Sequence, residues 1–485
     1  MKSKYPNILF ILSDQHRFCD IGYAGNRQVA TPYLDSLADE AAVFDHAYSN
    51  CPVCVPARGT LLTGFHAFNH GAAANDMPIN PQCHSIAHVL NDAGYNTAYI
   101  GKWNLGGTPR DRFIPEEERL GFQYWRGCNC NHDYMHAYYD DESNVRHPIE
   151  GYEPIAQTTL ALDYLNIHRT DKRPWALWLS FGTPHDPYLC LPDADVDLCR
   201  RRERTIVLRG NVSAYREFDY IPSGSHHAAR PAGQPESLKE IQYREHRPLF
   251  SNLRMDYAGY YRHIEYIDMQ IGRLLHWLDA NGLRDDTIVV YTSDHGNMLG
   301  SHGLLNKQWY YEESAHIPFV IRWPRGIVAG HRDVALGLVD VVPSLLGLAG
   351  ISSGFNFDGT DKSASIRKPC SAEKRYVYLY SIIPAHQAWF REIFSWRAIT
   401  DGHVLYATDQ ESKPIALYDL IADPLEMNSL IGDPSAELSY WQGLLCEQVE
   451  RFDGFMPWQQ LIKEKGLLDQ WNCSQQFFGY PVIHE

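Results

Sequence analysis

The sequence lacks any long hydrophobic run. Its first apolar stretch, Asn7 to Leu12, is closed by Asp14, so it is too short for a membrane helix or for the core of a signal peptide. No other apolar run approaches the length needed to span a bilayer. From this we expect a cytoplasmic protein without a membrane partner.

Positive charge and paired cysteines are also scarce. The formal net charge of −16 argues against nucleic acid or an anionic membrane as a general ligand, so an anionic substrate would need a local cluster of cations and metal. Eleven cysteines in 485 residues do not indicate a disulfide scaffold. Cys51 and Cys54 form a CxxC, which alone fits a non-enzymatic redox or metal-binding protein, but no second CxxC or CxxH completes a zinc site.

What the sequence does contain is a series of short apolar runs separated by helix-length segments. The runs that predict buried parallel strands are Asn7 to Leu12, Asn96 to Ile100, Trp175 to Phe181 and Thr287 to Thr292. The clearest helix runs from Asn252 to Ala280, and Gly282 suits its carboxyl end. Strands alternating with helices predict an α/β fold with a large, mostly parallel central sheet sandwiched by helices.

Changes in this pattern divide the chain. We expect a main domain over residues 1–375 and a smaller carboxyl-terminal α+β subdomain over residues 376–485, with strands at 376–382 and 396–400 and a helix at 436–451. The stretch from about 199 to 250 is rich in Arg, Pro, Gly and Ser without clear periodicity, which predicts a loop-rich insertion. A lid, a homo-oligomer contact and a plain solvated loop are all open for it.

Chemically capable side chains follow each of the four predicted strands. Asp14-Gln15 come after the first strand, Lys102 after the second, His185 after the third and Asp294-His295 after the fourth. In open α/β sheets the ligand site lies beyond the carboxyl ends of the strands. We therefore expect these groups to meet at one edge of the sheet and to form the active site.

A fifth group comes from the segment Cys54 to Gly64. Pro56 suits the first turn of a helix and Gly64 suits its end, which would place Cys54 at a helix amino terminus. Free N–H groups and the helix dipole favour an anion there, and Arg58 follows one turn later. A capped helix with a buried thiol is the alternative.

The segment reads Cys, any residue, Pro, any residue, Arg, followed by Thr63-Gly64, and it resembles the signature of the type I sulfatases in the alkaline-phosphatase-like superfamily. Further segments similar to that family are Asn7 to Asp14, Thr31 to Ala38, Gly94 to Trp103, Thr292 to Gly296, Tyr311 to Ser314 and Leu417 to Pro424. In the family a maturation enzyme oxidises the Cys to formylglycine, whose hydrate attacks a sulfate ester. The resemblance thus implies a sulfuric ester hydrolase acting on a carbohydrate or other small alkyl or aryl sulfate, with a formylglycine-generating enzyme as a partner.

The resemblance also assigns roles to individual residues. It implies one divalent metal, and the implied ligands are Asp14, Gln15, Cys54, Asp294 and His295. Oxygen ligands favour Ca²⁺, which is the metal we expect. An imidazole ligand favours Mn²⁺ instead, and Mg²⁺ is a further alternative. The catalytic residues it implies beside the metal are Cys54, Arg58, Lys102, His185 and Lys307, with His185 and Lys307 protonating the leaving group.

One departure from the family concerns Asn104. The family usually has Lys-Trp-His-Leu-Gly where this chain has Lys102 to Gly106, so the histidine expected to help release sulfate is missing. His66 and His70 are candidates to replace it. The departure also leaves open hydrolysis of a phosphonate or phosphate ester. On the substrate side we expect Asn104, His132, Asn75 and Asp76 to line the binding wall.

Overall fold

A ten-stranded sheet runs through the middle of the molecule in the computed structural model, which describes residues 4–212, 253–369, 375–383, 395–434, 437–478 and 482. The strand order is β11-β2-β10-β9-β1-β8-β4-β5-β6-β7. In chain order the strands are β1 Asn7–Ser13, β2 Ala42–Phe44, β4 Asn96–Lys102, β5 Tyr124–Cys128, β6 Tyr138–Asp140, β7 Arg146–Pro148, β8 Trp175–Ser180, β9 Thr287–Ser293, β10 Phe319–Arg322 and β11 Gly330–Arg332. All four predicted strands are therefore present, as β1, β4, β8 and β9.

The centre of this sheet is parallel, with antiparallel pairs on both sides of it and a parallel pair of β11 with β2 at one edge. β9, β1, β8, β4 and β5 pair in parallel, whereas β10 runs antiparallel to both of its neighbours, and β6 and β7 form an antiparallel edge. β8 and β9 are buried along their whole length, because helices cover both faces of the sheet and only continuous apolar runs fit such a position. The predicted mostly parallel α/β fold is confirmed.

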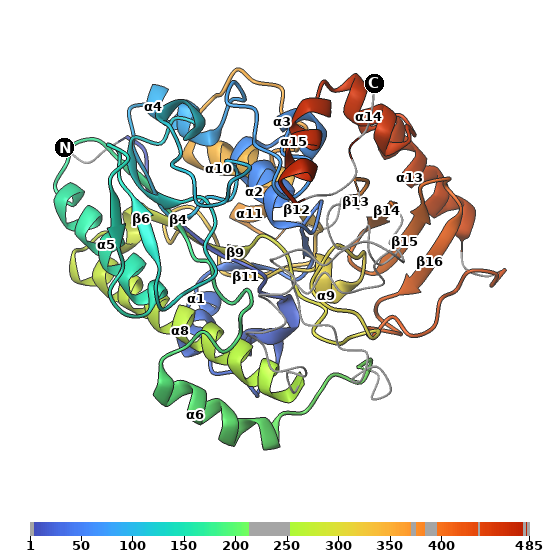
Figure 1. The fold of residues 1–485 in the computed structure, drawn as a ribbon, viewed down its shortest axis with the longest axis horizontal. Coiled ribbons are helices and arrows are strands. Elements are labelled where there is room, and N and C mark those ends of the chain that lie inside the picture. The colour runs from blue at the N-terminus through green and yellow to red at the C-terminus, as the bar shows by residue number, and fades with distance from the viewer. Residues whose placement is uncertain are drawn as a thin grey trace.

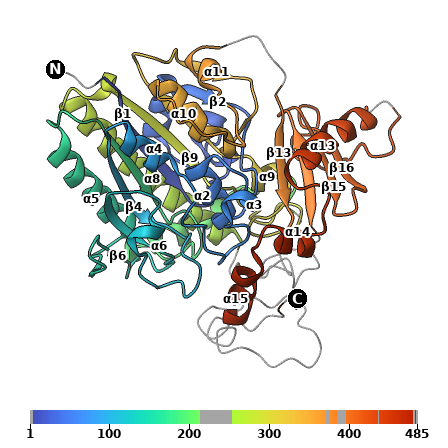
Figure 2. The same ribbon diagram turned by 90° about the horizontal axis from the view of Figure 1, so that it is seen from above.

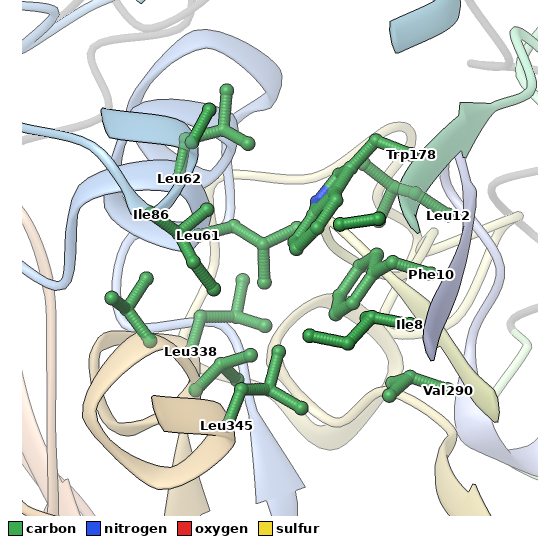
Figure 3. Close-up of a cluster of buried hydrophobic side chains, with 14 of the residues drawn as sticks. Ile8, Phe10, Leu12, Leu61, Leu62, Ile86, Trp178, Val290, Leu338 and Leu345 are labelled. Carbon is green, nitrogen blue, oxygen red and sulfur yellow. The ribbon is translucent and has the colours of Figure 1, made fainter. Parts of the chain in front are cut away.

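Alternate residues of the central strands point into two separate cores. Ile8, Phe10 and Leu12 of β1 face one side, where Trp178 and Val290 meet Leu61, Leu62, Ile86, Leu338 and Leu345 (Figure 3). The helices on this face are α2 Cys54–Thr63, α4 Ile86–Asp92 and α10 Val341–Ala349. Leu9 and Ile11 face the other side, which is covered by α1 Pro32–Asp39, α5 Glu153–His168 and α8 Leu253–Ala280 (Figure 1).

Helix α8 confirms the strongest helical prediction. Ile267, Ile271, Leu274 and Leu278 are fully buried against the second face, and Gly282 has a φ of +66°, the left-handed conformation that glycine adopts most readily at a helix end. The predicted first residue, Asn252, lies outside the described residues. None of the helices in the described ranges is both long and apolar enough to cross a membrane.

A second, antiparallel sheet lies to one side of the first (Figure 2). Its strands in order are β13 Val377–Ser381, β14 Trp396–Thr400, β15 Val404–Asp409 and β16 Pro414–Asp419, and it packs against α13 Leu438–Phe452 and α14 Trp458–Glu464 through a core that includes Trp441, Trp458 and Trp471. The last helix in the described residues is α15 Leu468–Phe478. The carboxyl-terminal α+β arrangement is thus present, while the boundary at residue 375 stays a prediction.

The remaining elements are short, and one of them reaches the start of the expected insertion, which itself stays a prediction. They are β3 Ala47–Tyr48 paired with β12 Leu336–Gly337, and the helices α3 Ala67–His70, α6 Asp193–Arg202, α9 Glu312–Ala315 and α11 Ser363–Arg367. Residues 199–202 belong to α6, so the helix extends into the stretch that composition alone marked as loop, because its Cys199 is buried beneath α8. Residues 213–252 lie outside the described ranges.

Candidate active site

The carboxyl ends of β1, β4, β8 and β9 bring the predicted polar groups together. Ser13 of β1 pairs with Ser293 of β9, so Asp14 and Asp294 both come directly after neighbouring parallel strands. Lys102 is the last residue of β4, and Ser180 ends β8 between β1 and β4. This edge of the sheet is where α2 starts, which adds Cys54 to the same site.

Cys54 is the first residue of α2 and is almost completely buried. Its Sγ lies 3.1 Å from His295 Nε2 and 3.9 Å from Asp14 Oδ1. Burial and Asp14 raise the pKa of the thiol, but the opposite effect of Lys307 and His295 is larger, so the net pKa lies below the ordinary value. The position therefore favours an anion, as expected for a helix amino terminus.

Arg58 lies one turn along α2, where it braces the two carboxylates. Its Nε donates to Asp294 Oδ2 at 2.9 Å, and a terminal nitrogen donates to Asp14 Oδ2 at 3.0 Å. The other terminal nitrogen donates to the Lys102 carbonyl at 2.8 Å and to Ser180 Oγ at 2.7 Å. Arg58 thus binds the Asp14 and Asp294 carboxylates, which together are called the floor of the site, rather than Cys54.

Because Arg58 takes both Oδ2 atoms, the Oδ1 atoms of the two carboxylates face His295. Their distances to His295 Nε2 are 3.7 Å from Asp14 and 3.6 Å from Asp294. His295 Nδ1 lies 2.9 Å from the Gly296 carbonyl, which accepts the Nδ1 proton, so that Nε2 faces the two carboxylates and Cys54 Sγ. Ligand atoms of Asp14, Cys54, Asp294 and His295 all lie within 4.8 Å of one another, so this donor set fits a divalent cation.

Gln15 is placed differently from the two carboxylates. Its backbone has a φ of +73°, which turns its side chain towards Lys307, and Lys307 Nζ donates to Gln15 Oε1 at 2.7 Å. The Gln15 Nε2 donates to Tyr188 Oη at 3.3 Å. A role of Gln15 as a metal ligand stays a prediction.

Two lysine–histidine pairs stand over this floor. Lys307 Nζ lies 2.7 Å from His185 Nε2, and Lys102 Nζ lies 3.1 Å from His132 Nε2 and 2.7 Å from Asp14 Oδ2. The two imidazole rings stack on each other, with centroids 4.5 Å apart and an interplanar angle of 14°. Burial, together with the adjacent lysine, holds the pKa of each histidine well below its usual range.

The remaining predicted substrate residues lie around the start of α2. Asn75 Oδ1 accepts from the Val55 N–H at 3.2 Å, so Asn75 caps the helix beside Cys54. Asp76 accepts two hydrogen bonds of 2.6 and 2.7 Å from Arg110. Arg110 was not among the predicted site residues, because no motif or periodicity in the sequence marks it. Asn104 has a φ of +59°, and its N–H donates to the Asn129 carbonyl, which places it beside the segment that carries His132.

His66 and His70, the candidates to replace the missing histidine, are both buried and contact other groups. His70 Nε2 is 3.2 Å from Thr60 Oγ1, its Nδ1 accepts from the Ala72 N–H, and the ring also forms a hydrogen bond with the backbone of Pro56. His66 packs between Tyr380 and Phe452. Their role as a replacement base stays a prediction.

The site combines a buried thiol, two carboxylates that can bind a cation, and two lysine–histidine pairs. Such a set of groups suits a hydrolase that cleaves the ester of an oxyanion. Comparison with known proteins identifies which one. The sulfatase family model matches residues 6–351, and the model named N-sulphoglucosamine sulphohydrolase, C-terminal, matches residues 300–450. The chain therefore belongs to the sulfatase family and is a sulfuric ester hydrolase, and the family implies a metal ion and a formylglycine derived from the cysteine.

Relatives and solved structures agree with this assignment. An ulvan-active sulfatase of Formosa agariphila is 34% identical over 89% of this chain and 78% of its own length. An N-acetylglucosamine-6-O-sulfatase of Bacteroides thetaiotaomicron is 27% identical over 93% and 86%. Among structures, a Bacteroides fragilis protein assigned to the sulfatases superposes with a TM-score of 0.78 at 25% identity, over 95% of this chain and 98% of that one. A phosphonate monoester hydrolase of Agrobacterium radiobacter shares the fold, with a TM-score of 0.69 at 23% identity over 92% and 96%.

Proposed function

We propose that this sulfatase hydrolyses a sulfate monoester of a carbohydrate, using formylglycine made from Cys54. The observation that carries the proposal is the position of Cys54 Sγ at the start of α2, next to His295 and Asp14, beneath two lysine–histidine pairs. The Sγ atom marks the place of the hydroxyl groups that the hydrated aldehyde would carry.

In the first step one of those hydroxyl groups gives its proton to a carboxylate of the site, of which Asp14 Oδ1 lies 3.9 Å from Cys54 Sγ, and its oxygen attacks sulfur while the bond from sulfur to the alcohol oxygen breaks. Lys102 and Lys307 would bind the sulfate oxygens, since both amino groups lie in the site. The leaving alcohol takes a proton from the Lys307–His185 pair, whose nitrogen atoms lie 2.7 Å apart.

Asp14, Asp294 and His295 would hold a single divalent cation, for which we propose Ca²⁺, with Gln15 and the matured Cys54 as neighbouring ligands. Such an ion polarises sulfate oxygens and stabilises negative charge near the nucleophile. Burial raises the pKa of Asp14, but the opposite effect of Lys102, His185 and Arg58 is larger, so the net pKa lies well below its ordinary value.

A groove beside the site supports a substrate larger than a simple sulfate ester. It has a volume of about 650 Å³ and adjoins Asp76 and Gly106, within the range of sites that take sugar-sized or larger ligands. Asn69, Asn80 and Lys465 add polar groups to its walls. The named carbohydrate sulfatases among the relatives act on comparable substrates, which favours a sulfated saccharide here.

The test is chemical and kinetic. A peptide that contains Cys54, taken from active protein, is expected to carry an aldehyde that reacts with a hydrazide, and the same protein should release sulfate from sulfated saccharides. Fully active protein with only an unmodified thiol at Cys54 would refute the formylglycine proposal. Faster turnover of aryl phosphonate than of any sulfate ester would instead favour the phosphonate alternative that Asn104 left open.

A further inference from the structure

The second half of the proposed reaction requires a base that the family position cannot supply. After the alcohol leaves, the sulfated diol must lose a proton from its free hydroxyl group while its carbon–oxygen bond to sulfate breaks. Asn104 has no group that accepts a proton at neutral pH. His66 Nδ1 lies 3.3 Å from Tyr380 Oη and His70 Nε2 lies 3.2 Å from Thr60 Oγ1, whereas His295 Nε2 faces the two carboxylates of the proposed metal site.

We propose that His132 is this base, so that the Lys102–His132 pair replaces the missing histidine. The inference rests on the proposed sulfatase mechanism and extends it to the release of sulfate. His132 takes the hydroxyl proton on Nε2, the electron pair of the broken O–H bond forms the C=O of the aldehyde, and sulfate leaves with the electrons of the C–O bond. Solvent then removes the proton from His132, and water rehydrates the aldehyde.

The geometry of the two lysine–histidine pairs carries the proposal. Each pair joins a lysine Nζ to a histidine Nε2, at 2.7 Å for Lys307 and His185 and at 3.1 Å for Lys102 and His132. The rings stack face to face, so the two Nε2 atoms belong to adjacent walls of the same site. One pair is used to donate the proton to the alcohol, and in the second, of the same construction, Lys102 binds sulfate oxygens while His132 has no role in that first step.

His132 also connects to the nucleophile through short steps. Lys102 Nζ touches Asp14 Oδ2 at 2.7 Å, and the other oxygen of that carboxylate lies 3.9 Å from Cys54 Sγ. His132 is half-buried, and its Nε2 contacts Lys102 Nζ at 3.1 Å and Cys130 Sγ at 3.6 Å. Burial and Lys102 keep its pKa well below the usual range, so the ring is neutral at rest, and Nε2 takes up the hydroxyl proton in place of its contact with Lys102.

The decisive variant is His132→Gln, with His136→Gln as the matched control. His136 lies in the same segment, and its side chain is 84% exposed. Rapid mixing with an aryl sulfate separates the steps, because an aryl alcohol leaves with little acid assistance. In His132→Gln we expect a burst of about one alcohol per aldehyde, followed by turnover slowed about a hundredfold to ten-thousandfold, the usual worth of general base catalysis. Wild type and His136→Gln should show no burst.

Two further measurements make the result specific to a base. Acid-quenched His132→Gln should contain the sulfated diol on the Cys54 peptide, and Asn104→His placed in the His132→Gln background should restore at least part of the turnover. His132→Ala with added imidazole tests the same step with a different replacement. Hydrazide labelling and thermal unfolding check that each variant is folded and carries the aldehyde.

Three outcomes would overturn the inference. Steady turnover of His132→Gln equal to wild type would exclude a base at this position. A slower burst phase with a raised KM would make His132 a substrate-binding residue, and a slow second phase that neither Asn104→His nor imidazole improves would give it a structural role. Failure of aldehyde-bearing wild type to turn over any sulfate ester would instead refute the proposed function.

Discussion

Replacing Arg58 by Ala should strongly destabilise the protein, because Arg58 is the cation between two buried carboxylates. Asp14 and Asp294 are fully buried, and each gives an Oδ2 atom to Arg58. Lys102 would still pair with Asp14 after the change, but Asp294 would lose its only ion-pair partner among the described lysines and arginines. Breaking a buried ion pair of this kind costs about 3–5 kcal/mol.

The expected shift in melting temperature follows from the size of the chain. With an unfolding entropy of about 2 cal/mol/K per residue, a protein of 485 residues loses about 1 °C for each kcal/mol, which gives a drop of about 3–5 °C. The assay is calorimetry of chelator-treated protein at neutral pH, so that no metal compensates for the lost charge. Adding a divalent cation should then restore part of the loss in the variant.

An exposed ion pair provides the control for this experiment. Arg200 pairs with Asp197 on α6 with more than half of each side chain exposed, and its replacement by Ala should change stability by less than about 1 kcal/mol. If Arg58→Ala melts within a degree of wild type without metal, the two carboxylates do not depend on Arg58. The electrostatic account of the floor of the site would then be wrong.

Two more predictions concern groups in and beside the site. Asp14→Ala or Asp294→Ala should abolish both stoichiometric binding of a divalent metal, measured by elemental analysis, and sulfate release, because each removes one carboxylate of the donor set; retained metal with normal turnover in either variant would contradict it. Glu153 is buried with one oxygen that has no hydrogen-bond partner, and burial raises its pKa to about 8, so the folded state keeps a proton that the unfolded state loses near pH 4.5. The wild-type protein therefore loses stability as the pH rises from about 4.5 to 8. Glu153→Gln should have a higher melting temperature than wild type, by a margin that grows over this range and then levels off. A margin independent of pH would show that Glu153 is ionised in the fold.

The sequence predicted the parts of the fold that depend on local pattern. Continuous apolar runs identified β1, β4, β8 and β9, because a strand that is buried on both faces is apolar along its whole length. The 3.6-residue period identified α8, because a helix that is buried on one face repeats its apolar residues once a turn. Strand β10 and the edge strands β6 and β7 were not predicted, since three- or four-residue strands carry too little pattern. The helix α6 was missed for a related reason, as its run of charged residues conceals the buried Cys199.

The site was predicted to the extent that its residues follow strands or belong to a motif. The proximity of Asp14, Lys102, His185 and Asp294 follows from the shared edge of the sheet. The contact between His132 and Lys102, and the pair of Arg110 with Asp76, depend on the path of long connections and left no periodic signal.

The site therefore divides into two parts that can change independently of each other. The reactive centre stands on strand ends and on the first turn of α2, where backbone hydrogen bonds and buried ion pairs allow little variation. The groups on its outer side, among them Asn75, Asp76 and Arg110, come from loops, and loops accept insertion and substitution far more readily than a buried sheet. Loop exchange between relatives would thus be a route to a new preferred sugar that preserves the hydrolytic step.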